Sequence, residues 1–99
     1  MYQKFIINQD GELLFGKVYQ HRELLRRGDS CPYGGGLWLL DEQRGAVLLF
    51  GRSFAFGPPC FENVTSIDWE GIGCAPCPLF FLPDWPHGER LVPVAANLW

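Results

Sequence analysis

The sequence predicts a fold of the α/β (α+β) class, with a small mixed or antiparallel β-sheet and one or two short helices. Three observations lead to this prediction. The chain has 99 residues, which suits a single domain spanning residues 1–99. Two apolar runs flank a short polar segment, a pattern typical of a β-hairpin. Twelve Gly and eight Pro indicate many turns and little long helix.

The first half of the chain predicts two strands and one short helix. Residues 4–7 are rich in aromatic and β-branched side chains, and the turn sequence Asn-Gln-Asp-Gly follows them. Residues 13–19 predict a second strand, which Gly16 interrupts. Residues 20–27 contain good helix formers, and Gly28 is suited to end a helix. This segment spans only two turns, so we expect a helix or a helical turn over residues 20–27.

The clearest structural signal is a hairpin formed by residues 37–40 and 46–50. A five-residue polar loop that ends in Gly45 joins these two runs. Neither run alternates with polar residues, so both faces of each strand should be covered. We expect these strands to lie at the centre of the sheet.

The second half of the chain predicts shorter elements. Residues 51–59 form a turn-rich stretch, and residues 61–69 predict a short helix. Residues 78–83 form a strand enclosed by prolines, and residues 91–94 an edge strand. Further prolines make the last quarter of the chain irregular.

The composition excludes several classes of protein. Hydrophobic residues make up 47% of the chain and the formal net charge is −3, so the chain is not of the disordered class. Its apolar runs are far shorter than the ~20 residues that cross a membrane, and its N-terminus does not have the pattern of a signal peptide. Only Arg26 and Arg27 are adjacent cations, which argues against nucleic acid. We expect a cytoplasmic protein with reduced cysteines and no membrane partner.

The hairpin brings two glycine-rich segments together. In antiparallel geometry the entry of the first strand lies beside the exit of the second, so residues 34–36 should lie next to residues 51–58. Glycines expose backbone N–H groups and adopt the conformations that form anion-binding nests. Ser53 adds a hydroxyl, Arg52 a cation and His21 an imidazole that can transfer a proton. These parts predict a phosphate site.

These motifs resemble those of the Janus/ocnus family, which contains the phosphohistidine phosphatases. The family has the same three glycines, the same hairpin length and the same Gly-x-Ser-x-Ala-aromatic-Gly-Pro exit, here residues 34–36 and 51–58. Upstream, Tyr19-Gln20-His21 and Cys31 are similar to a family segment with an aromatic residue, the His and a Cys-containing loop. The well-matched block covers about a quarter of the chain.

The resemblance implies a shallow phosphate site in a phosphohistidine phosphatase-like fold. By position, His21 is the catalytic base or proton shuttle. Ser53 and the backbone N–H groups around Phe54 and Ala55 hold the phosphoryl oxygens, and Lys4 matches a family Lys near the site. The glycines that shape this site are Gly34, Gly35, Gly36, Gly51 and Gly57. No metal or cofactor is expected, and the partner of this monomer is a phosphorylated protein or a small phosphorylated substrate.

Two departures from the family pattern leave the activity open. Leu37 stands where the family has an Arg directly after the glycines, and this removes a cation from the site. Arg52 occupies a family Tyr position and is a candidate replacement for that charge. One hypothesis is a phosphatase in which water or the His21 ring attacks phosphorus. The other is a non-catalytic relative that binds a phosphorylated or anionic partner.

A third hypothesis uses the thiols. Cys74 and Cys77 have the C-x-x-C spacing of redox and zinc sites. A redox pair normally opens a helix, whereas Pro78 and a strand-like run follow here. A zinc site needs two further ligands. The available residues, without a second C-x-x-C motif, are Cys31, Cys60 and His87. Thiol redox chemistry, zinc binding and incidental thiols remain as alternatives.

Overall fold

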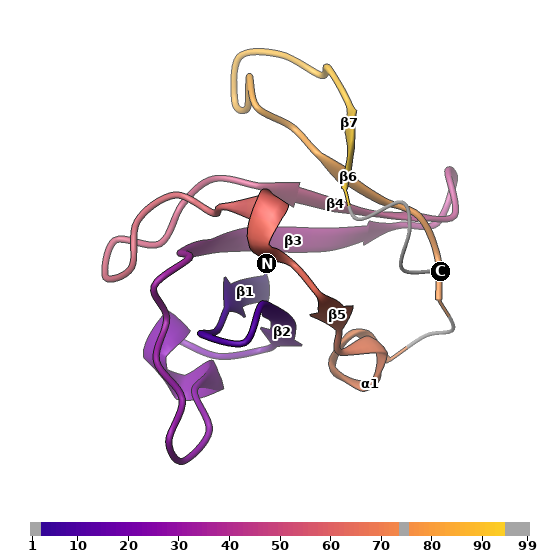
Figure 1. Ribbon diagram of the computed structural model, residues 1–99. Coiled ribbons are helices and arrows are strands. Elements are labelled where there is room, and N and C mark those ends of the chain that lie inside the picture. Colours follow the sequence, from indigo (N-terminus) through magenta and orange to yellow (C-terminus); the bar gives the residue numbers. More distant parts are fainter. Residues whose placement is uncertain (1–2, 74–75, 95–99) are drawn as a thin grey trace.

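The computed structural model describes residues 3–73 and 76–94, and its main feature is one mixed β-sheet (Figure 1). Seven strands follow the order β5-β2-β1-β3-β4-β6-β7 across the sheet. The pairs β2–β5 and β4–β6 are parallel, and the other neighbours are antiparallel. The predicted small mixed sheet with few helices is confirmed. The strands are β1 (Gln3–Ile7), β2 (Glu12–Gly16), β3 (Gly35–Asp41), β4 (Ala46–Phe50), β5 (Ser66–Ile67), β6 (Leu79–Phe81) and β7 (Val92–Val94).

The predicted hairpin is formed by β3 and β4, which cross the middle of the molecule in Figure 1. Asp41 stabilises the connection, because its Oδ1 accepts hydrogen bonds from the backbone N–H groups of Gln43 at 3.0 Å and Arg44 at 3.2 Å. Gly45 has a φ of +61°, which favours glycine at the end of this loop. Every residue of β4 is buried, as its unbroken apolar run predicts. The predicted edge strand is also confirmed, because β7 lies at one edge of the sheet.

Side-chain alternation gives the sheet two distinct faces. One face carries the hydrophobic core, and we call it the core face. Residues of the segment that follows the hairpin, including Phe61, Ile67 and Ile72, pack against this core. The buried residues of the core face are Phe5, Ile7, Leu13, Phe15, Trp38, Val47, Leu49, Leu79 and Val94.

The opposite face carries Lys4, and we call it the Lys4 face. Lys4 lies directly across from Gly16 on β2 and Leu37 on β3, so these three positions share this face. Phe50 lies across from Leu37, and its ring is 4.9 Å from the ring of Trp85. The short helix η1 (His21–Leu24) contacts β1 and β2. A Cβ atom on Gly16 would lie 2.6 Å from a Leu24 methyl carbon, so η1 packs on the Lys4 face.

The helix or helical turn predicted over residues 20–27 is present but shorter than predicted. Only η1 is helical, with 3-10 geometry, and the next residue, Leu25, is extended with φ −72° and ψ +128°. Asp29 explains the early end, because its carboxylate accepts the backbone N–H of Arg26 at 3.0 Å and closes a separate turn. Gly28, with a φ of +86°, belongs to that turn and does not cap the helix.

The short helix predicted within residues 61–69 is limited to a single 3-10 turn. A 3-10 turn, η2 (Phe61–Asn63), is followed by β5, and α1 (Trp69–Ile72) begins where the predicted helix ends. The edge of β2 accounts for this, since Ser66 pairs with Glu12 in a parallel ladder. Tertiary pairing therefore overrides the local preference for a helix.

The second predicted strand is shorter than residues 13–19. β2 ends at Gly16 because the chain then leaves the sheet toward η1. Within the described residues, no helix has the length and apolar character needed to cross a membrane.

Candidate functional site

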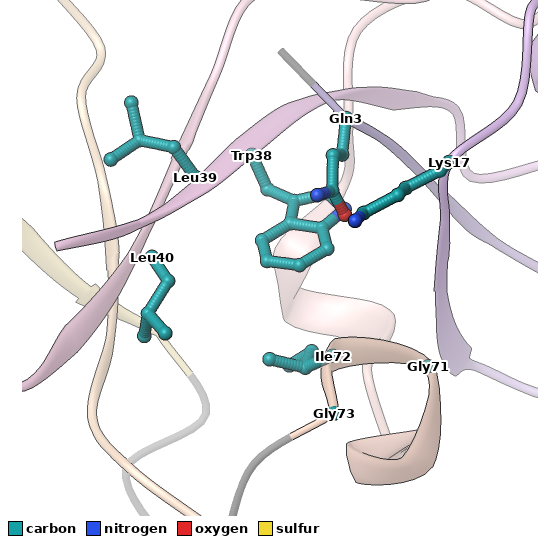
Figure 2. A pocket seen from close by; sticks show the side chains of 8 residues that line it. All are labelled: Gln3, Lys17, Trp38, Leu39, Leu40, Gly71, Ile72 and Gly73. Atoms are coloured by element: carbon teal, nitrogen blue, oxygen red, sulfur yellow. The ribbon is translucent and has the colours of Figure 1, made fainter. Parts of the chain in front are cut away.

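A cavity of about 520 Å³ lies beside Trp38 on the core face, between β1, β3 and α1, and we call it the Trp38 cavity (Figure 2). Trp38 is 3% exposed, and its Nε1 donates a hydrogen bond to the Lys4 carbonyl oxygen at 3.1 Å. Gln3 and Lys17 lie on one side of its ring and Ile72 on the other. This cavity has no imidazole, thiol or carboxylate side chain in its lining, which is formed by Gln3, Lys17, Trp38, Leu39, Leu40, Gly71, Ile72 and Gly73.

A smaller cavity, of about 300 Å³, lies at the Lys4 face and contains four of the predicted site residues. We call it the His21 cavity. Its residues come from three separate segments, namely β1, the chain around η1 and the turn after β4. The structure thus brings together four residues that the sequence analysis selected, His21, Lys4, Phe54 and Ala55. The complete lining is Lys4, Tyr19, Gln20, His21, Arg22, Phe54 and Ala55.

His21 opens η1 and is 9% exposed. Its Nε2 lies 2.8 Å from the carbonyl oxygen of Gly36. Because a carbonyl oxygen can only accept, Nε2 carries the proton in the neutral ring, and Nδ1 keeps a free lone pair. Burial lowers the pKa of His21, the hydrogen bond to Gly36 opposes this, and the positive charge of Lys4 lowers the pKa further. The pKa therefore lies below its ordinary value, and His21 is a neutral base near pH 7.

The charged side chains that line the His21 cavity are all cationic. Lys4 projects from β1, and Arg22 follows His21 on η1. No Asp or Glu is among the lining residues. Sequence analysis missed Arg22, although its position next to His21 was an available signal. This distribution of charge suits an anionic ligand.

The turn after β4 lines the cavity and contains two free amide groups. Ser53 organises this turn, because its N–H donates to the Gly35 carbonyl at 3.0 Å and its Oγ accepts the N–H of Phe56 at 3.1 Å. At the tip, the N–H groups of Phe54 and Ala55 donate to no acceptor among residues 3–73 and 76–94. These amides are therefore available to a ligand.

Two other predicted residues lie outside the cavity lining. Ser53 is fully buried, and its backbone and hydroxyl are already engaged in building the turn. Arg52 is exposed and is not among the lining residues. Leu37, at the family Arg position, lies across from Lys4, and its side chain and that of Trp85 both flank Gly51. Arg52 therefore does not supply the cavity with the positive charge that an Arg at position 37 would provide.

The glycine run allows β3 to enter the sheet very close to the turn. Gly34 has a φ of +77°, and a Cβ atom there would lie 2.0 Å from the Pro58 carbonyl oxygen. On Gly36, a Cβ atom would lie 2.6 Å from the Phe50 carbonyl oxygen. Gly35 N–H donates to the Gly57 carbonyl at 3.2 Å, which joins the two predicted glycine segments. The glycines thus hold the turn beside the strand whose carbonyl group binds His21.

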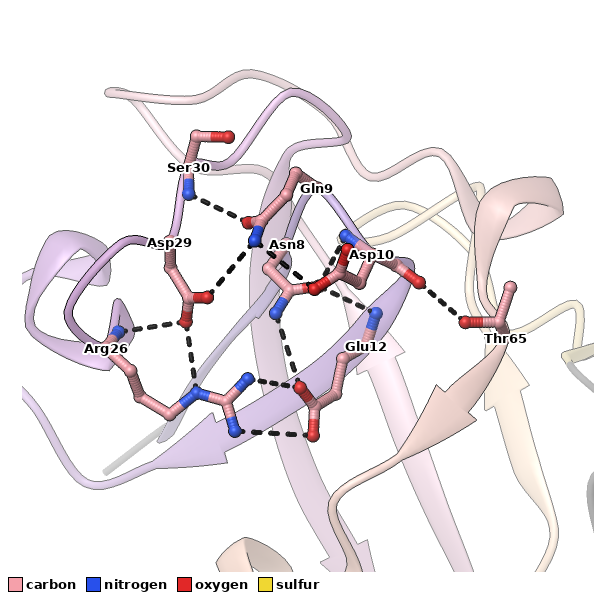
Figure 3. A network of polar contacts seen from close by, with 8 residues as sticks. All are labelled: Asn8, Gln9, Asp10, Glu12, Arg26, Asp29, Ser30 and Thr65. Carbon is pink, nitrogen blue, oxygen red and sulfur yellow. Dashed lines mark hydrogen bonds and ion pairs between the residues drawn. The ribbon is translucent and has the colours of Figure 1, made fainter.

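A polar network fixes the chain that follows η1 (Figure 3). Arg26 pairs with Glu12 on β2, and its Nε lies 3.1 Å from Asp29 Oδ2. Asn8 is fully buried, and its Oδ1 accepts the N–H groups of Asp10 at 3.0 Å and Glu12 at 2.9 Å. The network connects the turn between β1 and β2 to the loop after η1. It therefore supports the segment that carries His21.

The predicted thiol pair lies partly outside the described residues, because these do not include Cys74. Cys31 is half-buried, and its Sγ donates toward the carbonyl oxygens of Gly34 at 3.2 Å and Ile7 at 3.3 Å. Burial raises the pKa of the Cys31 thiol, while these two contacts oppose the shift. Across residues 3–73 and 76–94, no group of three or more His, Cys, Asp and Glu side chains is placed to hold a metal ion.

No protein-family model matches the chain, and no curated protein or solved structure matches it.

Proposed function

We propose that the His21 cavity binds a phosphoryl group and that the protein hydrolyses phosphohistidine, as do the phosphatases that its hairpin motifs resemble. One observation carries this proposal. His21, Lys4, Phe54 and Ala55 were selected from three distant parts of the sequence, and all four line one cavity. Convergence of residues from distant segments is expected of a functional site. The local structure of a single segment does not explain it.

The proposed ligand is a phosphoryl dianion. Lys4 and Arg22 supply positive charge, and the free N–H groups of Phe54 and Ala55 supply hydrogen-bond donors. Donors on a turn that is held by its own hydrogen bonds need little reorganisation when a ligand binds. His21 is neutral near pH 7, and no carboxylate lines the cavity, so no negative charge there repels the dianion.

The proposed reaction is attack of water on phosphorus. His21 Nδ1 accepts a proton from the attacking water as the new P–O bond forms. The P–N bond breaks, and the bonding electrons stay on the departing imidazole nitrogen. That nitrogen takes up a proton, which His21 can return. The products are free histidine and inorganic phosphate, and His21 is neutral again.

A non-catalytic phosphate-binding protein is the second candidate, and two observations favour it. The position of the family Arg holds Leu37, whose side chain lies beside Trp85. The hydroxyl of Ser53 already accepts a hydrogen bond inside its own turn. Both features reduce the number of groups that stabilise a transition state, while the groups that bind a ground-state phosphate remain.

Titration with inorganic phosphate, followed by NMR, tests the binding site. We expect shifts at the amides of His21, Phe54 and Ala55. The two lysines of the chain give a matched pair of variants, since Lys4 lines the His21 cavity and Lys17 the Trp38 cavity. Lys4→Met should weaken phosphate binding several-fold and Lys17→Met should not. Shifts confined to the Trp38 cavity would contradict the proposal.

Turnover separates the enzyme from the binding protein. A phosphohistidine peptide should be hydrolysed by the natural chain, and His21→Ala should reduce the rate by about 10²-fold or more. The control is Leu40→Ala, at an exposed residue of the Trp38 cavity, which should leave the rate unchanged. Phosphate binding without any turnover would establish the second candidate. A rate that His21→Ala does not alter would exclude the proposed mechanism.

A further inference from the structure

Two aromatic side chains at the His21 cavity are exposed to an unusual degree. Phe54 is fully exposed and Tyr19 is 91% exposed. The other exposed large apolar side chains among the described residues, Leu40, Trp85 and Val92, are only 37–39% exposed. Tyr19 and Phe54 both line the His21 cavity, although 34 residues separate them in the sequence. Exposed aromatic rings that gather at one site commonly mark a binding surface.

The backbone beneath each ring is held in place. Phe54 stands at the tip of the turn that Ser53 closes, where the Gly57 N–H donates to the Ser53 carbonyl at 2.8 Å. Tyr19 precedes Gln20, whose N–H donates to the Glu23 carboxylate at 2.6 Å. Both rings are therefore carried by fixed segments, although neither is packed into the core. Such rings offer apolar contact area at a low cost in conformational entropy.

The cavity has room for more than a phosphate group. Its volume of about 300 Å³ is at the lower end of the range of cavities that bind small organic molecules. Cations and free amides serve the charged part of a ligand, but they give no reason for two exposed rings. A flat, apolar group attached to the phosphoryl group would use both kinds of lining.

We infer that Tyr19 and Phe54 are specificity-determining residues that hold the ring to which the phosphoryl group is attached. This inference rests on the proposed phosphoryl site and adds to it a selection among phosphorylated groups. The site favours a phosphoryl group carried by an aromatic ring, such as imidazole, over one carried by an alkyl chain, such as that of lysine. Stacked or edge-to-face contact between rings supplies the difference in affinity.

Three stable probes test the inference in the natural chain. Inorganic phosphate reports the charged part of the site, phenyl phosphate adds a ring, and n-butyl phosphate adds an alkyl chain. We expect phenyl phosphate to bind about tenfold more tightly than n-butyl phosphate, as the energy of an aromatic pair implies. Dissociation constants from NMR titration give this ratio directly. Equal affinities for the two esters would overturn the inference.

Variants locate the preference. Phe54→Ala and Tyr19→Ala should each bring the phenyl-to-butyl ratio closer to one. Tyr19→Phe keeps the ring and should keep the ratio, whereas Phe54→Leu keeps an apolar side chain and should lose it. A ratio that survives both alanine substitutions would contradict the assignment of these residues.

The outcomes separate this inference from the function on which it rests. If the natural chain binds phosphate but does not distinguish the two esters, the specificity is wrong and the phosphoryl site stands. If it binds none of the three probes at the His21 cavity, the proposed function is wrong and the inference is wrong with it.

Discussion

The Trp38 cavity and the His21 cavity lie on opposite faces of one sheet, and they differ in what lines them. Adjacent residues of β1 supply both, since Gln3 faces the Trp38 cavity and Lys4 the His21 cavity. The Trp38 cavity is larger, at about 520 Å³, but Lys17 is its single titratable side chain. The His21 cavity, at about 300 Å³, contains a buried imidazole, two cations and free amides. The larger cavity is therefore not the one in which an imidazole, cations and free amides converge.

Strand β1 contributes both to the hydrophobic core and to the His21 cavity. Its side chains alternate between faces, so Phe5 and Ile7 build the core while Lys4 remains on the opposite face. The core face carries large apolar side chains, and the Lys4 face also buries apolar residues but places Lys4 at the His21 cavity.

Replacing Trp38 should produce the largest loss of stability. Trp38 is 3% exposed, packs edge-on against Phe15 at 5.3 Å between ring centroids, and bonds to the Lys4 carbonyl. Trp38→Ala should lower the free energy of unfolding by about 3–5 kcal/mol. Urea denaturation measures the change. Leu40→Ala, at a 39% exposed residue of the same cavity, is the control and should cost much less. Equal losses would mean that Trp38 is not part of the core.

Asn8→Ala should cause the next largest loss of stability. This substitution affects the network that supports the segment around His21. The substitution removes the acceptor for the N–H groups of Asp10 and Glu12. We expect the free energy of unfolding to fall by about 1–3 kcal/mol, since two polar groups lose their partner. Amide exchange should also become faster around His21, while the Trp38 cavity stays unchanged. Faster exchange at α1 alone would contradict the supporting role of the network.

Leu37→Arg should increase phosphate affinity by a smaller amount. Position 37 lies directly across from Lys4, so an Arg there adds a cation on the Lys4 face. We expect binding a few-fold tighter, because exposed charges contribute about 1 kcal/mol or less. The matched control is Leu39→Arg, which lies further along the same strand on the same face. Titration with inorganic phosphate checks both, and an equal gain for both variants would show a nonspecific charge effect.

The smallest expected effect is a dependence of stability on pH. The pKa of His21 is lower in the folded chain than its ordinary value, so the unfolded chain binds this proton more readily. The contribution of His21 is complete above about pH 6.5 and decreases as the pH falls below it. Denaturation at several pH values should show this decrease, and His21→Gln should remove it. Stability that rises as the pH falls through this range would contradict the assignment.

Lys4 and Lys17 allow a test of what lowers the pKa of His21. The positive charge of Lys4 contributes to the low pKa of His21. Lys4→Met should therefore raise the pKa of His21, as measured by NMR titration of the ring. Lys17→Met, on the opposite face, should leave it unchanged. A shift of the same size in both variants would place the effect in the net charge of the chain.

Sequence reasoning predicted the parts of the fold that depend on local patterns. The two apolar runs led to β3 and β4 at the sheet centre, and the glycine segments were expected side by side, as they are. The helices were less predictable. Good helix formers fill residues 20–27, but Asp29 closes a competing turn, and residues 61–69 meet the open edge of β2. Local preference is a weak force when such tertiary partners are present.

For the candidate site, the sequence by itself determined which residue types were available. It carried His21, Lys4 and the Phe54–Ala55 pair in recognisable positions, because glycine spacing and motif order are properties of the chain. Only the tertiary structure decided that these four residues share a cavity and that Arg22 joins them. It also turned Ser53 inward to hold its own turn. The physical reason is that a side chain's surroundings depend on segments distant in sequence, which only the folded sheet brings together.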